Sequence, residues 1–462
     1  MRIDDHALRP SARRAILQSF DFLPTAFADL RYPADVRNRL LPTLVLAGAV
    51  LARGGSAASD GRAREAVFER FKDSVVTVEV LPLAGEAKSV LGSGWAAAPG
   101  RIVTNYHVVG SFIRHPDRHG LQVKNGRGTF PARLVAFDLL NDLALLEASL
   151  PAPPLRLAAD TGQPGAPVIA FGNPEGLGLS LVEGVFNGFA EKGFIDRMLL
   201  SMPLNSGMSG GPILSARQEV VGTNVAVSWL SNSLSFGVPV AAAHALLRAA
   251  PVATTREALA ADVNRQLVAV EQRAFARAVQ PLLQETGALM PVGGALVPRP
   301  PDAFECWNRT ERQAQEEVSK TSYNCNLQFT PSLEDVGEVA SIEVLVEHFA
   351  TRTAGYGFYG GLVQHAPQHL GVDARPPGNG LLSSPECRAD RVRTEHLVWK
   401  VNVCSYAYVH HPGLGYFALA ATSISRPREA VYVAIHGRGV GADAFLSLSR
   451  ALLGDVRFSR AS

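Results

Sequence analysis

The chain has 462 residues, of which 47% are hydrophobic and 19% are charged, so it can form two packed domains and is not a disordered chain. Its 44 Lys and Arg and 42 Asp and Glu give a formal net charge of +2, and this balance gives no basic excess that would favour nucleic acid as a partner. The sequence contains no internal repeat, Walker-type loop or dinucleotide-binding fingerprint, so nothing in it indicates a nucleotide cofactor.

Residues 36–58 have the pattern of a secretory signal peptide. Two arginines precede an apolar run, 40–52, that is too short for a relaxed membrane span, and small residues follow it. The pattern predicts a periplasmic or secreted protein without a stable transmembrane anchor, and the alternative is a helix that packs on the next domain. Because signals begin at the start of a chain, we expect translation to start at Val36 and residues 1–35 to be an untranslated extension.

Residues from about 66 to 250 have the pattern of an all-β domain. Short segments such as 74–80, 168–171 and 220–227 are rich in β-branched residues and are bounded by Gly or Pro, as strands are. A short helix, 241–249, is expected to close the domain.

Three side chains in this region could act together in acyl transfer. His107 ends an apolar strand, Asp142 opens another strand that we expect to be buried, and Ser209 lies between glycines. A buried carboxylate that accepts a hydrogen bond from an imidazole fixes the tautomer of the ring and stabilises the imidazolium. Glycines beside Ser209 permit a tight turn in which the backbone N–H groups of Gly207 and Ser209 face an oxyanion. Asp138, earlier in the same loop, is the rival acid.

The order His, Asp, Ser is that of the chymotrypsin-like proteases, and residues 66–250 resemble the bacterial HtrA/Deg-type trypsin-like peptidases. The resemblance is carried, in chain order, by residues 104–109, 142–146, 168–178, 207–212, 221–224 and 236–239. It implies two six-stranded barrels with the catalytic triad in the cleft between them, protein or peptide substrates, and no need for a metal or an organic cofactor.

Two departures from the family are visible. Met208 stands immediately before the expected nucleophile, where family members usually have Asn and the digestive relatives have an Asp that pairs with an N-terminus freed by cleavage. A thioether cannot form that ion pair. After residue 250 nothing resembles the PDZ domain that commonly follows in HtrA proteins. A binding or sensing module with a latent protease domain is therefore the alternative to an active peptidase.

The resemblance also implies a specificity pocket with its base near Pro203. The residues expected to wall it are Asn224, Val225, Ala226, Ser235 and Phe236. None of these positions carries an acid that would bind Arg or Lys, so we expect cleavage after medium apolar residues such as Val, Leu, Ala or Met.

Residues 251–301 are expected to connect two domains. Apolar residues recur every three to five positions from Leu259 to Leu282, which predicts an amphipathic helix that Pro281 interrupts near its end. The Pro- and Gly-rich residues 290–301 are interpreted as a linker.

The last region, 302–462, predicts an α+β domain of unknown function. The expected elements are strands at 342–346, 396–401, 416–421 and 430–435 and a closing helix at 442–453. The aromatic and glycine-rich run 355–361 predicts either a binding loop or a packed turn.

All four cysteines, Cys306, Cys325, Cys387 and Cys404, lie in this region and lack the spacing of a zinc or redox site. Two disulfides are expected, and of the three possible pairings the sequential one closes the shortest loops; free buried thiols are the alternative. The histidines of the region also lack spaced Cys or carboxylate ligands, so surface histidines are expected instead of a metal site: His365, His369, His410 and His411.

Overall fold

The computed structural model of the chain describes residues 56–84, 90–191, 195–227, 234–284, 288–313, 318–327, 332–333, 337–351 and 382–459. The expected extension (1–35), most of the expected signal segment (36–55), the run 355–361, His365 and His369 lie outside the described residues. Among the helices that are described, none has the length and hydrophobicity needed to cross a lipid bilayer.

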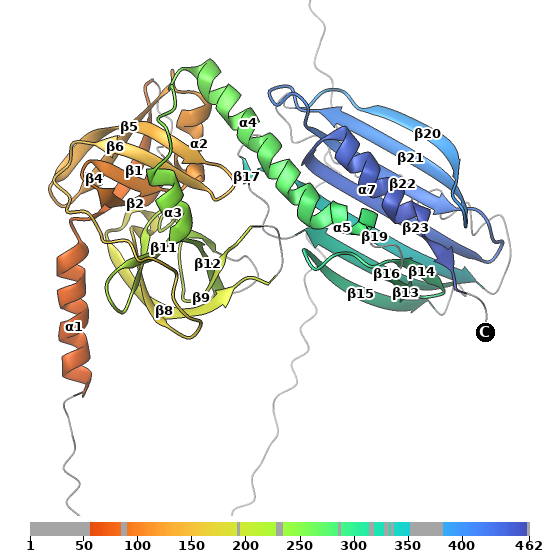
Figure 1. The fold of residues 1–462 in the computed structure, drawn as a ribbon, viewed down its shortest axis with the longest axis horizontal. Coiled ribbons are helices and arrows are strands. Elements are labelled where there is room, and N and C mark those ends of the chain that lie inside the picture. The colour runs from red at the N-terminus through yellow and green to blue at the C-terminus, as the bar shows by residue number, and fades with distance from the viewer. Residues whose placement is uncertain are drawn as a thin grey trace, which may run out of the picture. The chain divides into compact units, whose positions relative to one another are not determined.

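The first β-barrel is formed by strands whose side chains alternate between the interior and the surface. In β1 (Val75–Pro82) the side chains of Val76, Val78 and Val80 are at most 2% exposed and fill the barrel. The remaining strands are β2 (Val90–Ala98), β3 (Arg101–Thr104), β4 (His119–Asn125), β5 (Gly128–Asp138) and β6 (Leu143–Ala148). Antiparallel pairing closes them in the order β1-β2-β3-β6-β5-β4, with helix α2 (Tyr106–Arg114) between β3 and β4 (Figure 1).

The second barrel is also closed and antiparallel, in the order β10-β11-β12-β9-β8-β7. Its elements are β7 (Pro167–Gly172), the short 3-10 helix η1 (Pro174–Gly176), β8 (Ser180–Phe189), β9 (Met198–Ser201), β10 (Pro212–Ser215), β11 (Val220–Val227), β12 (Leu234–Pro239) and the closing helix α3 (Val240–Leu247). Two closed six-stranded barrels confirm the predicted chymotrypsin-like double barrel.

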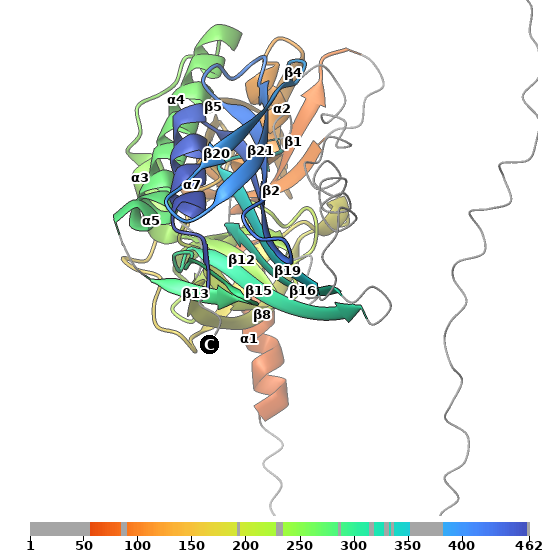
Figure 2. The same ribbon diagram turned by 90° about the vertical axis from the view of Figure 1, so that its right-hand side faces the viewer.

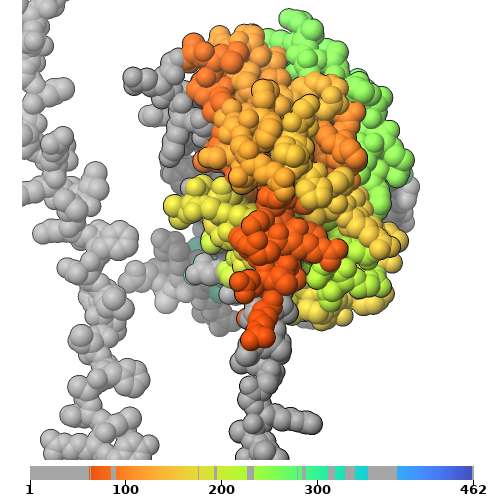
Figure 3. All heavy atoms as spheres, turned by 90° about the vertical axis from the view of Figure 1, so that its left-hand side faces the viewer, coloured from red at the N-terminus to blue at the C-terminus, as the bar shows by residue number. Residues whose placement is uncertain are grey.

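Helix α1 (Ser56–Phe71) precedes the first barrel and was not expected from the sequence. Most of its described side chains are exposed, but Phe71 is buried and its ring lies 6.2 Å from that of Phe171 in β7. The ring of Phe68 lies 6.3 Å from the same residue. The last turn of α1 is therefore the part that packs, on the face of the barrels that Figure 3 shows.

The connector is helical, as predicted. Helix α4 (Arg256–Ala274) begins at Thr255, whose side chain accepts a hydrogen bond from the N–H of Ala258, and it continues through a π-helical turn, η2 (Phe275–Val279), into α5 (Gln280–Gln284). Pro281 lies in α5, where it cannot donate a backbone hydrogen bond. The hydrogen-bonding pattern changes from α-helical to π-helical just before it.

The interpretation of residues 290–301 as a linker is wrong for most of that stretch. β13 (Leu289–Val292) and β14 (Ala295–Pro298) form a hairpin, and β14 also pairs with β24 (Arg457–Phe458). The two residues between the strands are glycines, and Gly293 has a φ of +56°, a conformation that this residue adopts without strain. A Gly-Gly pair between two short apolar runs is a hairpin signal that the composition obscured.

The C-terminal region is α+β, as predicted, and is dominated by one antiparallel sheet. Its seven strands are β15 (Phe304–Gln313), β16 (Val318–Leu327), β19 (Ser341–Thr351), β20 (Glu386–Arg393), β21 (Val398–Ala407), β22 (Gly415–Ser423) and β23 (Glu429–Val440), in the order β15-β16-β19-β23-β22-β21-β20. Helix α7 (Ala442–Gly454) packs on β22 and β23 (Figure 1). Figure 2 shows α7 and α5 on the same side of this sheet. A separate pair, β17 (Ser332–Leu333) and β18 (Gly337–Glu338), completes the described strands.

Both edges of this sheet carry a disulfide. Cys306 of the edge strand β15 is bonded to Cys325 of β16, and Cys387 of the opposite edge strand β20 is bonded to Cys404 of β21. In each case the two cysteines are directly opposite in the strand register. The pairing is the sequential one, and each disulfide joins an edge strand to its neighbour.

Candidate active site

Asp142 holds His107 at two points. The carboxylate accepts a hydrogen bond from the backbone N–H of His107 at 2.9 Å and lies 2.7 Å from Nδ1 of the imidazole. Asp142 has a φ of +60°, and its own carbonyl accepts hydrogen bonds from the side chain of Asn105 at 2.7 Å and from the N–H of Tyr106 at 3.1 Å. The first turn of α2 and the loop before β6 are thus joined around the imidazole, and the ring orientation is fixed.

The rival acid makes different contacts. The carboxylate of Asp138 accepts hydrogen bonds from the backbone N–H of Asn141 at 3.0 Å and from its side-chain nitrogen at 2.7 Å. This arrangement caps the turn between β5 and β6. It is Asp142, and not Asp138, that lies against His107.

The pairing changes the acidity of His107. Desolvation lowers the pKa of the imidazole, but the charge of Asp142 and its hydrogen bond to Nδ1 raise it by more, so the pKa lies above its usual value. The His107 side chain remains 41% exposed, so the ring can still be reached from solvent. A histidine held in this way can accept a proton and stabilise the resulting charge.

Ser209 lies in a loop of two consecutive turns. The N–H of Met208 donates to the carbonyl of Asn205 and the N–H of Gly211 donates to the carbonyl of Met208, both at 3.1 Å. Gly210 has a φ of +89°, and a Cβ there would lie 2.1 Å from the carbonyl oxygen of Ser93, so only glycine fits. The hydroxyl of Ser209 donates to the carbonyl of Val225 in β11 at 3.1 Å. In the described part of the chain no hydrogen bond joins Ser209 to His107.

A buried serine of the first barrel holds this loop in place. The N–H of Ser93 donates to the carbonyl of Ser209 at 2.8 Å, and its hydroxyl donates to the carbonyl of Gly207 at 2.7 Å. The same hydroxyl accepts a hydrogen bond from the N–H of Asn173 at 2.8 Å. Sequence reasoning did not identify Ser93 as a site residue, although the Gly-Ser-Gly run that contains it is visible on inspection.

Met208 is also an anchor for the loop. Its side chain is 1% exposed and belongs to the hydrophobic core of the second barrel. The position that departs from the family pattern is therefore held by apolar packing. No ion pair is needed to keep it inside the barrel.

Two of the expected pocket residues have another role. Asn224 is fully buried, and its side-chain nitrogen donates to the carbonyls of Phe171 at 2.9 Å and Met208 at 3.3 Å. Ser235 is 1% exposed and donates to the carbonyl of Met202 at 2.7 Å. Both side chains join β11 and β12 to the segment that precedes Ser209. This departs from the expectation that they face a substrate.

The other expected pocket positions differ in accessibility. Pro203 is exposed, and Val225 and Phe236 are partly exposed. The side chain of Ala226 lies outside the described residues. Three of the expected positions, Pro203, Val225 and Phe236, therefore remain available to line a pocket.

A buried cation near the acid was also missed from the sequence. Arg197, just before β9, is 6% exposed, and its guanidinium interacts electrostatically with the carboxylates of Asp142, Asp138 and Asp196. Desolvation lowers the pKa of Arg197, and these three carboxylates partly offset it. The only signal in the sequence is a charged pair, Asp196-Arg197, directly before an apolar strand.

A groove of about 720 Å³ lies on the first barrel and the loop that follows β7. It runs between β1, the turn between β4 and β5, and the loop 173–179, and it includes Leu91, Lys124 and Leu177. Asn173, which donates to Ser93, also donates from its side chain to Thr77 in this groove at 2.8 Å. Ser93 therefore connects Asn173, which lines the groove, to the loop that carries Ser209.

The prediction of surface histidines is correct for His410 and wrong for His411. His410 is exposed, but His411 is 8% exposed and its Nδ1 lies 2.8 Å from the side-chain oxygen of Asn264 in α4. Among the described residues, no group of three or more His, Cys, Asp or Glu side chains is arranged to hold a metal ion.

Residues 92–222 match the family model of the trypsin-like peptidase domain. This part of the chain is a trypsin-like peptidase domain. The chain is 30% identical over 194 residues to the periplasmic pH-dependent serine endoprotease DegQ of Escherichia coli, in an alignment that covers 40% of this chain and 40% of DegQ. It is 30% identical over 207 residues to the chloroplastic protease Do-like 1 of Arabidopsis thaliana, covering 39% of this chain and 46% of that protein.

Among solved structures, the active form of a protease from M. tuberculosis is 25% identical, with a TM-score of 0.37, covering 42% of this chain and 89% of that chain. The chain spans less than half of the length of the two curated relatives named above.

Proposed function

We propose that the protein is a serine endopeptidase that hydrolyses peptide bonds with Ser209, His107 and Asp142. The observation that carries the proposal is the pairing of Asp142 with Nδ1 of His107 at 2.7 Å inside a trypsin-like peptidase domain that also contains the glycine-flanked serine. The similarity to proteins named serine endoproteases supports the same reaction class.

In this mechanism Ser209 Oγ attacks the carbonyl carbon of the scissile bond while His107 Nε2 takes the hydroxyl proton. Asp142 keeps Nδ1 protonated and stabilises the imidazolium. The tetrahedral oxyanion is bound by the backbone N–H groups of Gly207 and Ser209, which donate no hydrogen bond within the described residues. His107 then returns the proton to the leaving amine, and water hydrolyses the acyl-enzyme by the same steps in reverse.

The groove on the first barrel supports an endopeptidase. The groove is connected to the Ser209 loop through Asn173, which donates to Ser93, and we expect the residues that follow the scissile bond to lie on this side. A site open on that side admits a polypeptide that continues beyond the scissile bond. An exopeptidase that binds a free C-terminus would need that side closed.

The proposed specificity is cleavage after medium apolar residues. Pro203, at the base of the proposed pocket, brings no negative charge, and transfer of an unpaired cation into such a site is strongly unfavourable. Preference among apolar residues is expected to be modest, because one methylene is worth about 1–3 kcal/mol. Profiling with a mixed peptide library measures this, and dominant cleavage after Arg or Lys would require withdrawal of the pocket assignment.

The proposed triad is tested by substitution. Ser209→Ala and His107→Ala should each leave the fold intact and remove essentially all hydrolysis, because the residues act as a unit. Ser206→Ala, three positions away in the same loop, is the matched control and should retain activity. Loss of activity in Ser206→Ala with retention in Ser209→Ala would show that the nucleophile is misassigned.

One observation favours a second function, a latent protease domain in a binding or sensing protein. The Ser209 hydroxyl is bonded to Val225, so attack requires rotation of the side chain toward His107. Labelling with a fluorophosphonate separates the two, since the probe reacts only with an activated serine and a formed oxyanion hole. Prompt labelling of the full chain supports the peptidase, and its absence supports latency.

We also propose that the protein is exported to the periplasm or secreted. The two disulfides support an oxidising compartment, and a relative of the peptidase domain is named periplasmic. N-terminal sequencing of protein from its native host should begin between residues 57 and 61. A mature chain that retains residues 1–35 and has four alkylatable thiols would refute export.

A further inference from the structure

The connector helix α4 contacts different parts of the protein with different sides. Asn264 and Gln266 are two residues apart, so at about 100° per residue their side chains lie on opposite sides of the helix. Glu271, seven residues after Asn264, returns to within about 20° of it. Between the two sides lies an apolar stripe that includes Leu259 and Val263, which are buried.

On one side, Gln266 binds the backbone of the loop that carries the proposed catalytic acid. Its side-chain nitrogen donates to the carbonyl of Phe137 at 3.0 Å, and its side-chain oxygen accepts from the N–H of Leu139 at 2.8 Å. These two residues flank Asp138, at the end of β5. A single amide therefore satisfies a donor and an acceptor where the sheet ladder ends.

The bonded segment leads directly to Asp142. The carbonyl of Leu139 accepts a hydrogen bond from the N–H of Asp142 at 3.3 Å. Leu139 is 2% exposed and belongs to the same hydrophobic cluster as Leu267 of α4. Gln266 thus holds one end of the turn whose other end presents the carboxylate to His107.

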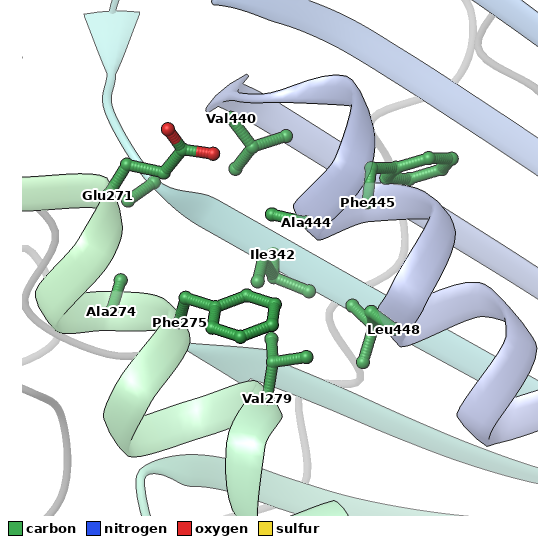
Figure 4. A pocket seen from close by; sticks show the side chains of 10 residues that line it. Glu271, Ala274, Phe275, Val279, Ile342, Val440, Ala444, Phe445 and Leu448 are labelled. Carbon is green, nitrogen blue, oxygen red and sulfur yellow. The ribbon is translucent and has the colours of Figure 1, made fainter. Parts of the chain in front are cut away.

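The opposite side of α4 contacts the C-terminal region. The side-chain oxygen of Asn264 lies 2.8 Å from Nδ1 of His411, and the carboxylate of Glu271 accepts a hydrogen bond from the N–H of Gly441, the residue that begins α7. In Figure 4, the side chains of Glu271 on the connector helix and of Val440 line an apolar pocket together with residues of α7. Helix α4 is therefore hydrogen-bonded both to the loop that carries Asp142 and to the C-terminal region.

We propose that Gln266 is a positioning residue for Asp142, and that α4 links the catalytic acid to the C-terminal region. Gln266 touches no substrate and acts by fixing the backbone from Phe137 to Leu139. The inference rests on the proposed function for its kinetic consequence, but the position of Asp142 against His107 can be measured without turnover.

The test compares Gln266→Met with Gln272→Met in the full chain. Met matches Gln in shape but forms neither hydrogen bond, and Gln272 is an exposed glutamine on the same helix. The readout is the pKa of His107, followed by NMR on histidine-labelled protein. Arg197, which is electrostatically coupled to Asp142, is unchanged in both variants.

Gln266→Met should lower the pKa of His107 toward its ordinary value of 6.5, because Asp142 is less firmly held. It should also reduce kcat by up to about a hundredfold with little change in KM, as expected when a catalytic group is displaced by about 1 Å. A folded Gln266→Met protein with the titration and kcat of the wild type would overturn the positioning role.

The link to the C-terminal region has its own variant. Glu271→Ala removes the bond to Gly441 and should shift the His107 titration in the same direction by a smaller amount. An unchanged titration would overturn the link and leave the role of Gln266 standing. A wild-type protein without peptidase activity would refute the proposed function, while the titrations would still decide this inference.

Discussion

The anchor at Met208 gives a quantitative prediction. Met208→Ala removes Cγ, Sδ and Cε from a side chain that is 1% exposed in the core of the second barrel. Truncation of a buried Met to Ala costs about 2–5 kcal/mol, part of which is the cavity that remains. The residue precedes Ser209, so the loss of packing should also loosen the turn that presents this serine. We expect lower stability together with slower fluorophosphonate labelling.

The assay is urea unfolding combined with the labelling rate, with Met208→Leu as the control. The control conserves apolar volume and should cost less than about 1.5 kcal/mol. If Met208→Ala loses less than about 1 kcal/mol and labels at the wild-type rate, then apolar packing at this position does not hold the loop and the reasoning fails.

Further predictions concern the pairing of His107 with Asp142, the support of the Ser209 loop by Asn224, and a disulfide of the C-terminal sheet. Because the pKa of His107 is raised, kcat/KM should fall on acidification with a midpoint above pH 6.5. Asp142→Asn should lower that midpoint, because the charge of Asp142 and its hydrogen bond raise the pKa of His107, and it should lower kcat by about 10⁴-fold; an unmoved midpoint contradicts the pairing. Asn224→Ala loses two hydrogen bonds and should cost about 1–3 kcal/mol in urea unfolding while slowing fluorophosphonate labelling; wild-type values would dismiss it as a loop support. Cys306→Ser with Cys325→Ser opens a 19-residue loop and should cost about 3 kcal/mol, measured against the wild type without reductant. Equal stability of the two proteins would count against that estimate.

The candidate site residues could be predicted from the sequence where the proposed chemistry requires one particular kind of side chain. Short sequence motifs contain His107, Asp142 and Ser209. The strands of the barrels could be predicted from the alternation of apolar side chains, as in β1. The structure brings His107 and Asp142 together as the motif order implied. The hydroxyl of Ser209 donates to the carbonyl of Val225, and no motif predicts that contact.

The supporting residues could not be predicted, because each acts on a part of the chain far away in sequence. Ser93 bonds to Gly207, 114 residues away, and Gln266 bonds to Leu139, 127 residues away. Gln266 lies in no pattern that distinguishes it from other glutamines, and the Gly-Ser-Gly run around Ser93 does not tell which loop its side chain reaches. Asn224 was noticed, but position in a strand does not tell which way a polar side chain points until the neighbouring strands are known.

The edge disulfides have a consequence for a protein whose proposed activity is to cut polypeptides. The chain from Cys306 to Cys325 and the chain from Cys387 to Cys404 are each closed into a covalent ring. A single cut inside either ring adds one water molecule but releases no fragment, and both new ends stay on the sheet. Self-cleavage in these hairpins would therefore leave one intact molecule on a gel, and the nicked pieces would separate only after reduction.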